Sequence, residues 1–486
     1  MANMNSIFGF IPEVTKPTEK KVAFNVKLKW TLIILSAFFI LTNIPLFGLS
    51  GNALARFEYL ALMLGTDFGS IISLGIGPIV MASIILQLLT GAGIINIDTS
   101  TTEGKKFFQG VQKILVFFFI LFESLVYVLM QGLQADPVLG AIGPFILIIQ
   151  LILGGLAIFY MDEVTTKWGF GSGVSLFIGA GVSLRLITQA FQFFGEDAAT
   201  GKLMFQPSGK FLVMINSLIS QPSDVTAFLA AAAAIISTII IFLIVVWVQS
   251  LKVEIPLSFG KLRGYGVKWP LSFFYASVMP VILTAALLAN VSLVGGLIEN
   301  SAMPCLVEEG ICTGFGQIAT HLTWIGTFDK STGQAISGVA FWIGSTNLLE
   351  LFIRGGFLWK YLIQGFFHVL TFALLCTVFS VFWVKTSGMD SKAQAKKIAS
   401  SGLQVAGFRQ DIRVLESILD RYIMPLTIMG GAAIGILASA TNLMGALVSG
   451  TAVLLVIMIM FQFYQNIAQQ HAEDMNPAMK KFMGGM

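Results

Sequence analysis

The chain has 486 residues, of which 56% are hydrophobic and only 11% are charged. Soluble domains carry about 25% charged residues, so this composition excludes an ordinary soluble domain and indicates a polytopic membrane protein. The formal net charge of +4 is informative only through its distribution, because Lys and Arg near the spans set the orientation of a membrane protein.

The N-terminal segment, residues 1–27, interleaves apolar residues with lysines and predicts an amphipathic segment on the cytoplasmic membrane surface. It is mostly polar and lacks an early apolar core with a small-residue cleavage site, so we expect no secretory signal peptide. The first apolar run predicts a span at 28–48.

The next apolar stretch, residues 68–95, is interrupted near its start by Gly75, Gly77 and Pro78, which loosen or stop a helix. Broken helices at membrane depth are tolerated only where the irregular backbone is buried in protein or lines a cavity. We therefore interpret 50–74 as a re-entrant or surface segment that leads into a span at 76–95, and expect a pathway through the membrane at this place.

Further apolar runs predict eight more spans, which gives ten in total: 107–133, 138–161, 170–194, 226–250, 272–296, 362–384, 423–440 and 444–468. With the N-terminus inside, inner segments hold 22 of the 29 Lys and Arg residues. This asymmetry predicts a multi-pass protein of the cell membrane with both termini in the cytoplasm, including a tail at 469–486.

Ten spans divide into two halves, 28–195 and 225–468, around an external hinge loop at 196–224. The second span of each half contains a proline, Pro78 and Pro280. Interrupted segments at corresponding positions indicate an inverted repeat around a central pathway, although a simple proline kink explains each one equally well. The predicted fold is therefore an all-α membrane protein of two inverted five-helix halves around a central pore.

Candidates for catalysis are few. The three histidines are His321, His368 and His471, and the glycine-flanked serine at 169–173 lacks the spacing of a hydrolase nucleophile. No nucleotide-binding loop or metal-ligand cluster is evident, so we expect neither an enzyme nor a cofactor. In the long external loop at 297–361, Cys305 and Cys312 are either a disulfide or two free thiols.

Ionisable residues inside the spans are scarce, and each is a functional hypothesis because a charge in lipid is costly. Glu123 lies near the middle of the third span. It either forms a polar cluster at a helix seam with Gln87 and Asn290 or is satisfied locally. Two long basic cytoplasmic loops, 251–271 and 385–422, are either solvated faces that contact anionic lipid or a surface for a phosphate-rich partner.

Two classes of function can be weighed against this pattern. A secondary transporter is built from inverted repeats with broken helices. However, it needs polar ligands at the midplane, which are few here, and has no use for long basic loops. An intramembrane hydrolase needs a Ser–His or paired-Asp arrangement that the sequence does not offer.

Several long motifs, in order along nearly the whole chain, together resemble the SecY family, the central channel subunit of the Sec protein translocase, and its archaeal branch in particular. The motifs are IPEVTKPTEKKVAF, SLGIGPIVMASIILQLLTGAGII, GFGSGVSLFIGAGVS, VEIPLSFGKLRGYGVKWPLSFFYASVMPVIL, GLQVAGFRQDIRVLESILDRYIMPLT and GALVSGTAVLLVIMIMFQFY. The resemblance implies a channel that passes unfolded polypeptides across the membrane and releases apolar helices sideways into lipid.

The resemblance also implies roles for individual residues. An aliphatic pore ring would consist of Ile76, Val80, Val174, Ile178, Ile282 and Leu455. A plug would lie just before the second span, at about 50–74. A lateral gate between the second and seventh spans would use Gln87, Glu123 and Asn290. The basic loops would dock a translating ribosome through Lys261, Arg263, Lys268, Arg409 and Arg413.

The partners implied are SecE and a small beta subunit, the ribosome or signal recognition machinery, signal sequences and nascent polypeptides, and membrane lipids. Two positions depart from the family pattern. The chain has Val278 where the family commonly has Asn, and Met81 where a small hydroxyl residue is usual. Both changes make the gate seam more apolar, so they bear on the energetics of gating.

Overall fold

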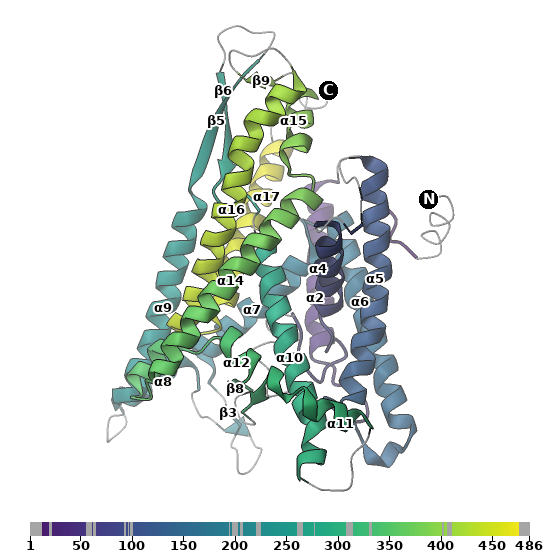
Figure 1. Cartoon of the computed structure of the whole chain (residues 1–486), viewed down its shortest axis with the longest axis vertical. Coiled ribbons are helices and arrows are strands. Elements are labelled where there is room, and N and C mark those ends of the chain that lie inside the picture. The colour runs from purple at the N-terminus through teal and green to yellow at the C-terminus, as the bar shows by residue number, and fades with distance from the viewer. Residues whose placement is uncertain are drawn as a thin grey trace.

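A computed structural model describes the fold of residues 12–18, 22–54, 61, 65–91, 94–95, 97, 101–193, 195–196, 203–204, 208–219, 225–259, 266–276, 278–307, 314–329, 333–400, 403–405 and 411–475. Long helices run roughly parallel to one another and form a single bundle (Figure 1). The first half of the chain supplies five of them: α2 (Phe24–Thr42), α4 (Gly77–Gly91), α5 (Thr102–Leu129), α6 (Ile142–Trp168) and α7 (Gly173–Phe191).

The second half supplies five further long helices: α9 (Val225–Gln249), α10 (Met279–Val307), α14 (Trp359–Thr386), α16 (Ile412–Met444) and α17 (Gly450–Met475). Within the described residues, nine of these ten helices are long and apolar enough to cross a bilayer, and α4 is the exception. With 15 residues, α4 is about 22 Å long, which is shorter than the hydrocarbon core of about 30 Å.

The break before α4 is the interruption that the sequence predicted. Residues 65–76 form turns rather than a helix, and Gly75 has a φ of +54°, a left-handed conformation that favours glycine. The segment is fastened by backbone hydrogen bonds from Leu46 N to Gly69 O (2.8 Å) and from Ile71 N to Ile44 O (2.9 Å). The second span is therefore a short helix extended by an irregular, buried segment.

Short elements cap the end of the bundle that lies opposite the long β-hairpin (Figure 1). They are β1 (Leu49–Asn52) paired with β2 (Leu133–Ala135), η2 (Pro137–Leu139), β3 (Gly195–Glu196) paired with β4 (Leu203–Met204), α8 (Lys210–Ile219), α11 (Gly314–His321), η3 (Thr323–Ile325), β7 (Thr327–Phe328) paired with β8 (Ala335–Ser337), α12 (Val339–Ile343) and α13 (Leu348–Ile353). The sequence predicted a loop at 297–361, but in the structure α10 continues to Val307 and so includes the first residues of that segment.

The other end carries a three-stranded sheet of order β6-β5-β9 and a short helix (Figure 1). Its elements are β5 (Lys252–Phe259), β6 (Gly266–Ser272), β9 (Leu403–Val405) and α15 (Ser391–Ser400). The expected cytoplasmic loops 251–271 and 385–422 are thus largely ordered here. A second apolar core, including Ile255, Leu271, Ile398 and Leu419, joins the hairpin to α15 and the start of α16 because alternate strand residues face one side.

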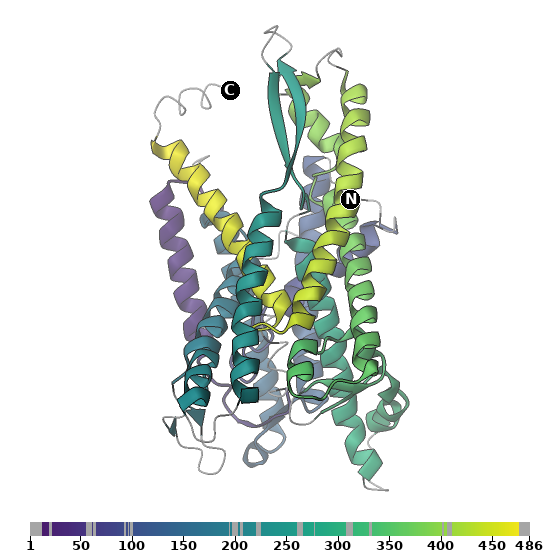
Figure 2. The same ribbon diagram turned by 90° about the vertical axis from the view of Figure 1, so that its left-hand side faces the viewer.

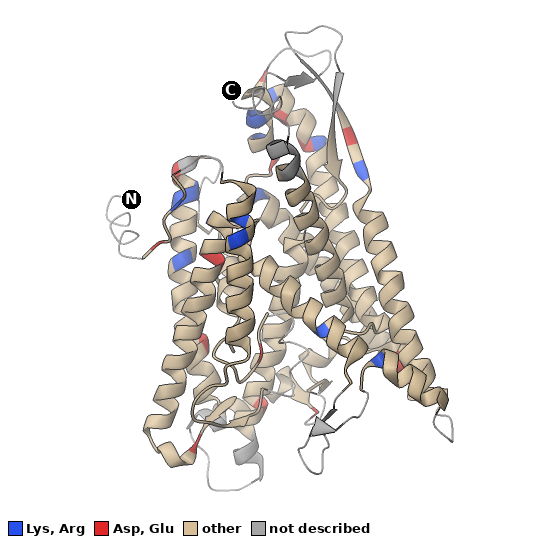
Figure 3. Ribbon diagram, turned by 180° about the vertical axis from the view of Figure 1, so that it is seen from behind, with Lys and Arg blue, Asp and Glu red and all other residues tan. Residues whose placement is uncertain are grey.

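The start of α2 and the end of α17 lie side by side (Figure 2). Lys27 Nζ donates to Gln470 Oε1 at 3.0 Å, and Gln470 Nε2 donates to the Val22 carbonyl at 3.1 Å. Most Lys and Arg residues of the described chain gather toward the end that carries the sheet and α15 (Figure 3). Exposed apolar side chains such as Leu243 and Trp247 of α9 face outward, as expected of a surface in lipid.

Candidate functional site: a central constriction between two cavities

The six residues predicted to form the ring are all buried. Their exposed fractions are 0% for Ile76 and Ile178, 1% for Leu455, 2% for Ile282, 3% for Val80 and 6% for Val174. They come from four separate places in the fold, namely the start of α4, α7, α10 and α17, and belong to one continuous apolar cluster. Val174 and Ile178 are four residues apart on α7, so they share one face of that helix.

One cavity, of about 330 Å³, lies on the side of the β-sheet end and borders three of these residues, Val80, Val174 and Ile282. This inner cavity is where the fold brings α4, α7 and α10 together. Its remaining lining mixes apolar side chains with polar ones that come mainly from α4, α5 and the end of α14. The apolar residues are Ile79, Phe108, Met279, Leu283 and Trp383, and the polar ones are Ser83, Gln87, Lys105, Gln109, Gln112, Asp162, Ser172, Thr386 and Ser387. Val80, Val174 and Ile282 therefore lie together in the lining of one cavity, which we call the inner vestibule.

A second cavity, of about 320 Å³, lies beyond the constriction toward the opposite end. It is lined by Ala285 and Ala289, one and two turns outward from Ile282 on α10, and by Thr451, one turn outward from Leu455 on α17. The outer cavity thus continues the same helix faces that carry the ring residues. We call the six buried aliphatic residues of this cluster, Ile76, Val80, Val174, Ile178, Ile282 and Leu455, the waist.

The segment before α4 packs against the waist. A Cβ atom on Gly65 would lie 3.7 Å from the backbone N of Ile178. On the other side, Gly154 of α6 is so close to the segment that a Cβ there would lie 1.9 Å from the Ile71 carbonyl oxygen. Ser73 fixes the turn, since its hydroxyl accepts from Gly69 N at 2.9 Å. Residues 55–60 and 62–64 of the predicted plug lie outside the described residues.

The three predicted gate residues have different surroundings. The Glu123 carboxylate lies against the start of α4, with Oε2 3.0 Å from a Cβ built on Gly77. Gln87 lines the inner cavity, and its buried Oε1 has no hydrogen-bond partner in the described chain. Because Gly77 and Gln87 are ten residues apart on α4, Glu123 and Gln87 lie about 15 Å apart along its axis. Asn290 of α10 donates to the Ala286 carbonyl of its own helix at 2.8 Å.

The predicted ribosome-docking residues fall at the sheet end of the molecule. Lys268 belongs to β6, where its backbone pairs with Pro256, and the Arg413 side chain is exposed at the start of α16. Lys261, Arg263 and Arg409 lie outside the described residues, as does Cys312 of the pair discussed above. Among the described cysteines, Cys376 is a free, buried thiol on α14.

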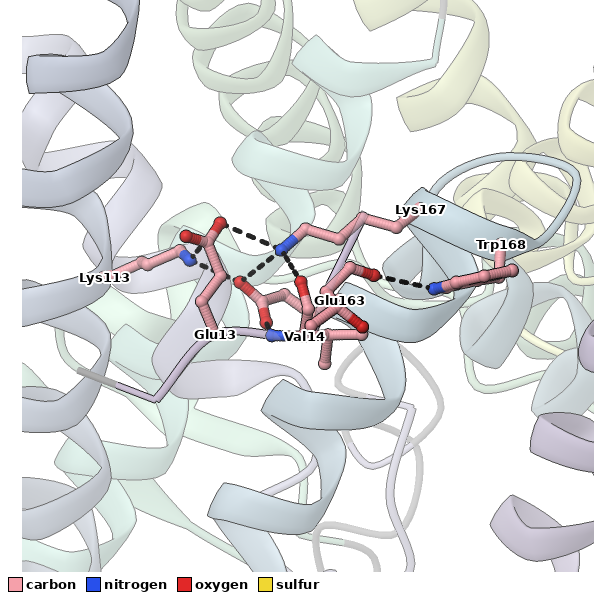
Figure 4. A network of polar contacts seen from close by, with 7 residues as sticks. Glu13, Val14, Lys113, Glu163, Lys167 and Trp168 are labelled. Atoms are coloured by element: carbon pink, nitrogen blue, oxygen red, sulfur yellow. Dashed lines mark hydrogen bonds and ion pairs between the residues drawn. The ribbon is translucent and has the colours of Figure 1, made fainter. Parts of the chain in front are cut away.

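Sequence reasoning did not find a network of charges that holds residues 13–15 against α5 and α6 (Figure 4). Glu13 pairs with Lys113 at 3.0 Å and with Lys167 at 2.9 Å, while Glu163 also bonds to Lys113. Val14 N donates to Glu163 Oε2 at 2.9 Å. Hydrogen bonds from Lys167 and then from Lys113 lower the pKa of the Glu13 carboxyl to about 2.

A signal for part of this network was present in the sequence, because Glu163 and Lys167 have the i,i+4 spacing of a helical ion pair. A second unpredicted feature is Asp162, whose Oδ1 accepts from Val174 N at 3.0 Å. This carboxylate of α6 therefore caps α7 at the ring residue itself. The Glu13 pairs and the Asp162 cap could not be inferred from local spacing, because their partners belong to different elements.

Comparison with known proteins agrees with this geometry. The SecY family model matches residues 70–464. The chain belongs to the SecY family. It is 40% identical over 483 residues to the protein translocase subunit SecY of Methanothermobacter thermautotrophicus, with 98% of each chain covered. This membership, with the nine long apolar helices of the described chain, makes it a multi-pass membrane protein.

Two solved structures resemble this SecY family member closely. One is a protein-conducting channel, with a TM-score of 0.77 and 34% identity over 97% of this chain and 98% of that one. The other is Sec61 in the canine ribosome–channel complex from the endoplasmic reticulum, with a TM-score of 0.74 and the same identity and coverage. The helical fold is therefore that of the SecY and Sec61 channels.

Proposed function

We propose that this chain is a protein-conducting channel that translocates unfolded polypeptides across the membrane and releases transmembrane segments laterally into the bilayer. The observation that supports this proposal is that the six aliphatic residues are buried, that three of them line the inner vestibule, and that the helices of Ile282 and Leu455 continue into the lining of the outer cavity. Membership of the SecY family and likeness to a protein-conducting channel support it.

An aliphatic waist suits this task for physical reasons. Side chains such as Ile178 and Ile282 change rotamer to fit a passing chain of varying bulk, and they offer it no polar group on which to stall. When the pore is empty they contact one another and exclude water, because a hydrophobic constriction gates by dewetting. The irregular segment at 65–76, packed against Ile178, would act as the plug that completes this seal.

The lateral exit would lie between α4 and α10, which pack against each other and supply Val80 and Ile282 to the lining of one cavity. Glu123, Gln87 and Asn290 would supply polar contacts at different depths of this seam rather than one cluster. Met81 and Val278 make the seam more apolar, so an entering signal sequence would compete with apolar contacts as well as with polar ones.

The sheet end would be cytoplasmic, because the Lys and Arg residues gather there and the inside is the positively charged side. Both termini would then be inside. A ribosome would dock on the β5–β6 hairpin and the 401–413 region through Lys261, Arg263, Lys268, Arg409 and Arg413, as the likeness to Sec61 in a ribosome–channel complex supports. SecE, a small beta subunit, the signal recognition machinery and membrane lipids would be further partners.

Crosslinking of a stalled, signal-bearing nascent chain tests the pore assignment. The three native cysteines are first removed, and a single cysteine is then introduced at Ile76, Val174 or Ile282. Leu243→Cys, on the lipid-facing side of α9, is the matched control. We expect adducts at the three waist positions and none at Leu243. If none of the three waist positions reacts, the pore assignment fails; a secondary transporter would then be the better hypothesis.

A further inference from the structure

The outer cavity contains a chain of polar contacts that the proposed function does not use. His368 of α14 and Asn442 of α16 both line it, and His368 is only 3% exposed. His368 Nδ1 lies 2.7 Å from the Ile343 carbonyl oxygen, and its Nε2 lies 3.4 Å from Asn442 Nδ2. Asn442 Oδ1 in turn accepts from Thr451 N at 2.7 Å. We call these three side-chain contacts the outer relay.

The two backbone groups at the ends of the outer relay, the Ile343 carbonyl and the Thr451 N–H, determine the direction of every hydrogen bond between them. The Ile343 carbonyl can only accept, so Nδ1 of His368 carries the proton and Nε2 is the acceptor. The Thr451 backbone N–H can only donate, so the Asn442 oxygen faces it and the Asn442 amide nitrogen faces the imidazole. The relay is complete only with a neutral imidazole, because a proton on Nε2 would set two donors against each other.

The outer relay acts on the helix that carries a ring residue. Thr451 is the second residue of α17, so Asn442 caps the first turn of that helix, where backbone N–H groups have no partner within the helix. Leu455 follows one turn later. The start of α17 packs beside the turn from α16, where the Thr451 hydroxyl also donates to Ala438 O at 3.3 Å. Fixing this turn fixes where Leu455 lies.

We propose that His368 and Asn442 are positioning residues that hold the outer end of α17, and thus Leu455, in the closed constriction, and that protonation of His368 from the outer side loosens the seal. This inference rests on the proposed function of the waist. The outer relay would thus be a second interaction that keeps the channel closed, and it lies in the second half of the chain. It is separate from the plug segment, which packs against α7 and α6 in the first half.

Charged groups around the relay come from α13, with its C-cap residue Arg354, and from α14. Glu350 of α13 lines the same cavity and pairs with Arg354 at 2.7 Å. Lys360, two turns before His368 on α14, lies 4.1 Å from the centre of the Phe341 ring. The Glu350 carboxylate also accepts from Asn347 Nδ2 at 3.1 Å, so it is engaged within its own segment. The response to outer acid is therefore assigned to His368, and Glu350→Gln serves as the check on that assignment.

The test measures ion conductance of the resting full-length channel in planar bilayers. At neutral pH we expect Asn442→Ala to raise the conductance about fivefold, the shift in a closed–open equilibrium that loss of one helix cap produces. Ser439→Ala is the matched control, because Ser439 is a buried polar residue on the same helix that bonds only within α16. We expect no increase in that variant.

Acidifying only the outer bath to about pH 4 protonates the His368 imidazole from the outer cavity, which it lines. We expect the intact channel and Glu350→Gln to leak under this condition and to reseal at neutral pH. His368→Gln should stay sealed at both pH values, because its amide can donate to Ile343 O and accept from Asn442 without titrating. His368→Leu should leak at both. An acid response that persists in His368→Gln, or that is absent from the intact channel, overturns the inference.

Two further variants separate this inference from the proposed function. Ile178→Gly and Leu455→Gly widen the waist directly, so each should leak at any pH. If neither leaks, the waist is not the barrier and the proposed function fails. If both leak while Asn442→Ala behaves like Ser439→Ala, the channel assignment stands and only the outer relay is refuted.

Discussion

The contact between Gly154 and the plug segment gives the sharpest test of the closed state. Gly154 of α6 has no side chain, and an alanine there would place Cβ 1.9 Å from the Ile71 carbonyl oxygen and 2.8 Å from the carbonyl carbon. Real Cβ atoms essentially never approach closer than 3.0 Å, so the Ile71 backbone must retreat by about 1.1 Å. This obstacle is backbone rather than the flexible end of a side chain, so the strain cannot be relieved by a rotamer change.

Overpacking of this kind costs about 1–3 kcal/mol, which shifts a closed–open equilibrium about 5- to 150-fold. The cost falls on the closed state alone if the segment leaves this place when the channel opens. We therefore expect Gly154→Ala to raise the resting ion conductance by at least about fivefold. It should also reduce the hydrophobicity that a signal sequence needs to open the channel, because part of the closed-state stability is already lost.

The assay is single-channel recording of the resting chain in planar bilayers, together with translocation of a weak signal sequence into proteoliposomes. Gly181→Ala is the control, because Gly181 lies on α7 and a Cβ there meets nothing within 4 Å. It should leave conductance unchanged. Equal conductance in Gly154→Ala and Gly181→Ala would refute the reasoning, since it would mean that the segment at 65–76 does not form part of the seal.

Three further predictions concern the cap on α7, the tether of the β5–β6 hairpin and the charge network around Glu13. Asp162→Ala should lower the thermal unfolding midpoint, since losing a cap costs about 0.5–2 kcal/mol, whereas Asp162→Asn, which keeps an accepting oxygen, should change it little. Tyr275→Phe should speed amide hydrogen exchange in the β5–β6 hairpin, because its hydroxyl donates to the Met389 carbonyl at 2.6 Å; burial and then Asp390 raise its pKa, so the tether persists at all ordinary pH values. Glu13→Gln should speed amide hydrogen exchange at Val14, whose N–H donates to Glu163 Oε2 at 2.9 Å, with Glu103→Gln as the control. Because the carboxyl of Glu13 has its pKa lowered from 4.5 to about 2, its contribution is complete above about pH 4.5 and is lost only as the pH falls through about 2; loss of protection at Val14 already at pH 4.5, after correction for the intrinsic exchange rate, would contradict this assignment.

The membrane-protein class and the break in the second span could be predicted from the sequence, because both depend on residues that are neighbours along the chain. Long uncharged runs identify helices that must lie in lipid, and Gly75, Gly77 and Pro78 interrupt the second of them whatever it packs against. The motifs that resemble the SecY family placed aliphatic residues at the constriction. The structure finds all six of them buried in one apolar cluster.

Distances between elements could not be predicted in the same way. Periodicity along α4 does not say that Gln87 lines a vestibule while Glu123 lies about 15 Å away at the start of the helix. The Glu13–Lys167 pair joins residues 154 positions apart, and its partners have no sequence spacing that marks them. Glu163 and Lys167 could be recognised as a pair because they share one helix.

By itself, the sequence determined that this protein is a polytopic membrane protein of the SecY family with a broken second span, since burial in lipid and backbone preference act locally. Only the tertiary structure decided that Val80, Val174 and Ile282 line one cavity, that Asp162 caps α7, and that Asn442 contacts both His368 and the start of α17. Those contacts depend on how helices from both halves pack, and side-chain packing and hydrogen-bond direction are properties of the assembled bundle rather than of any segment.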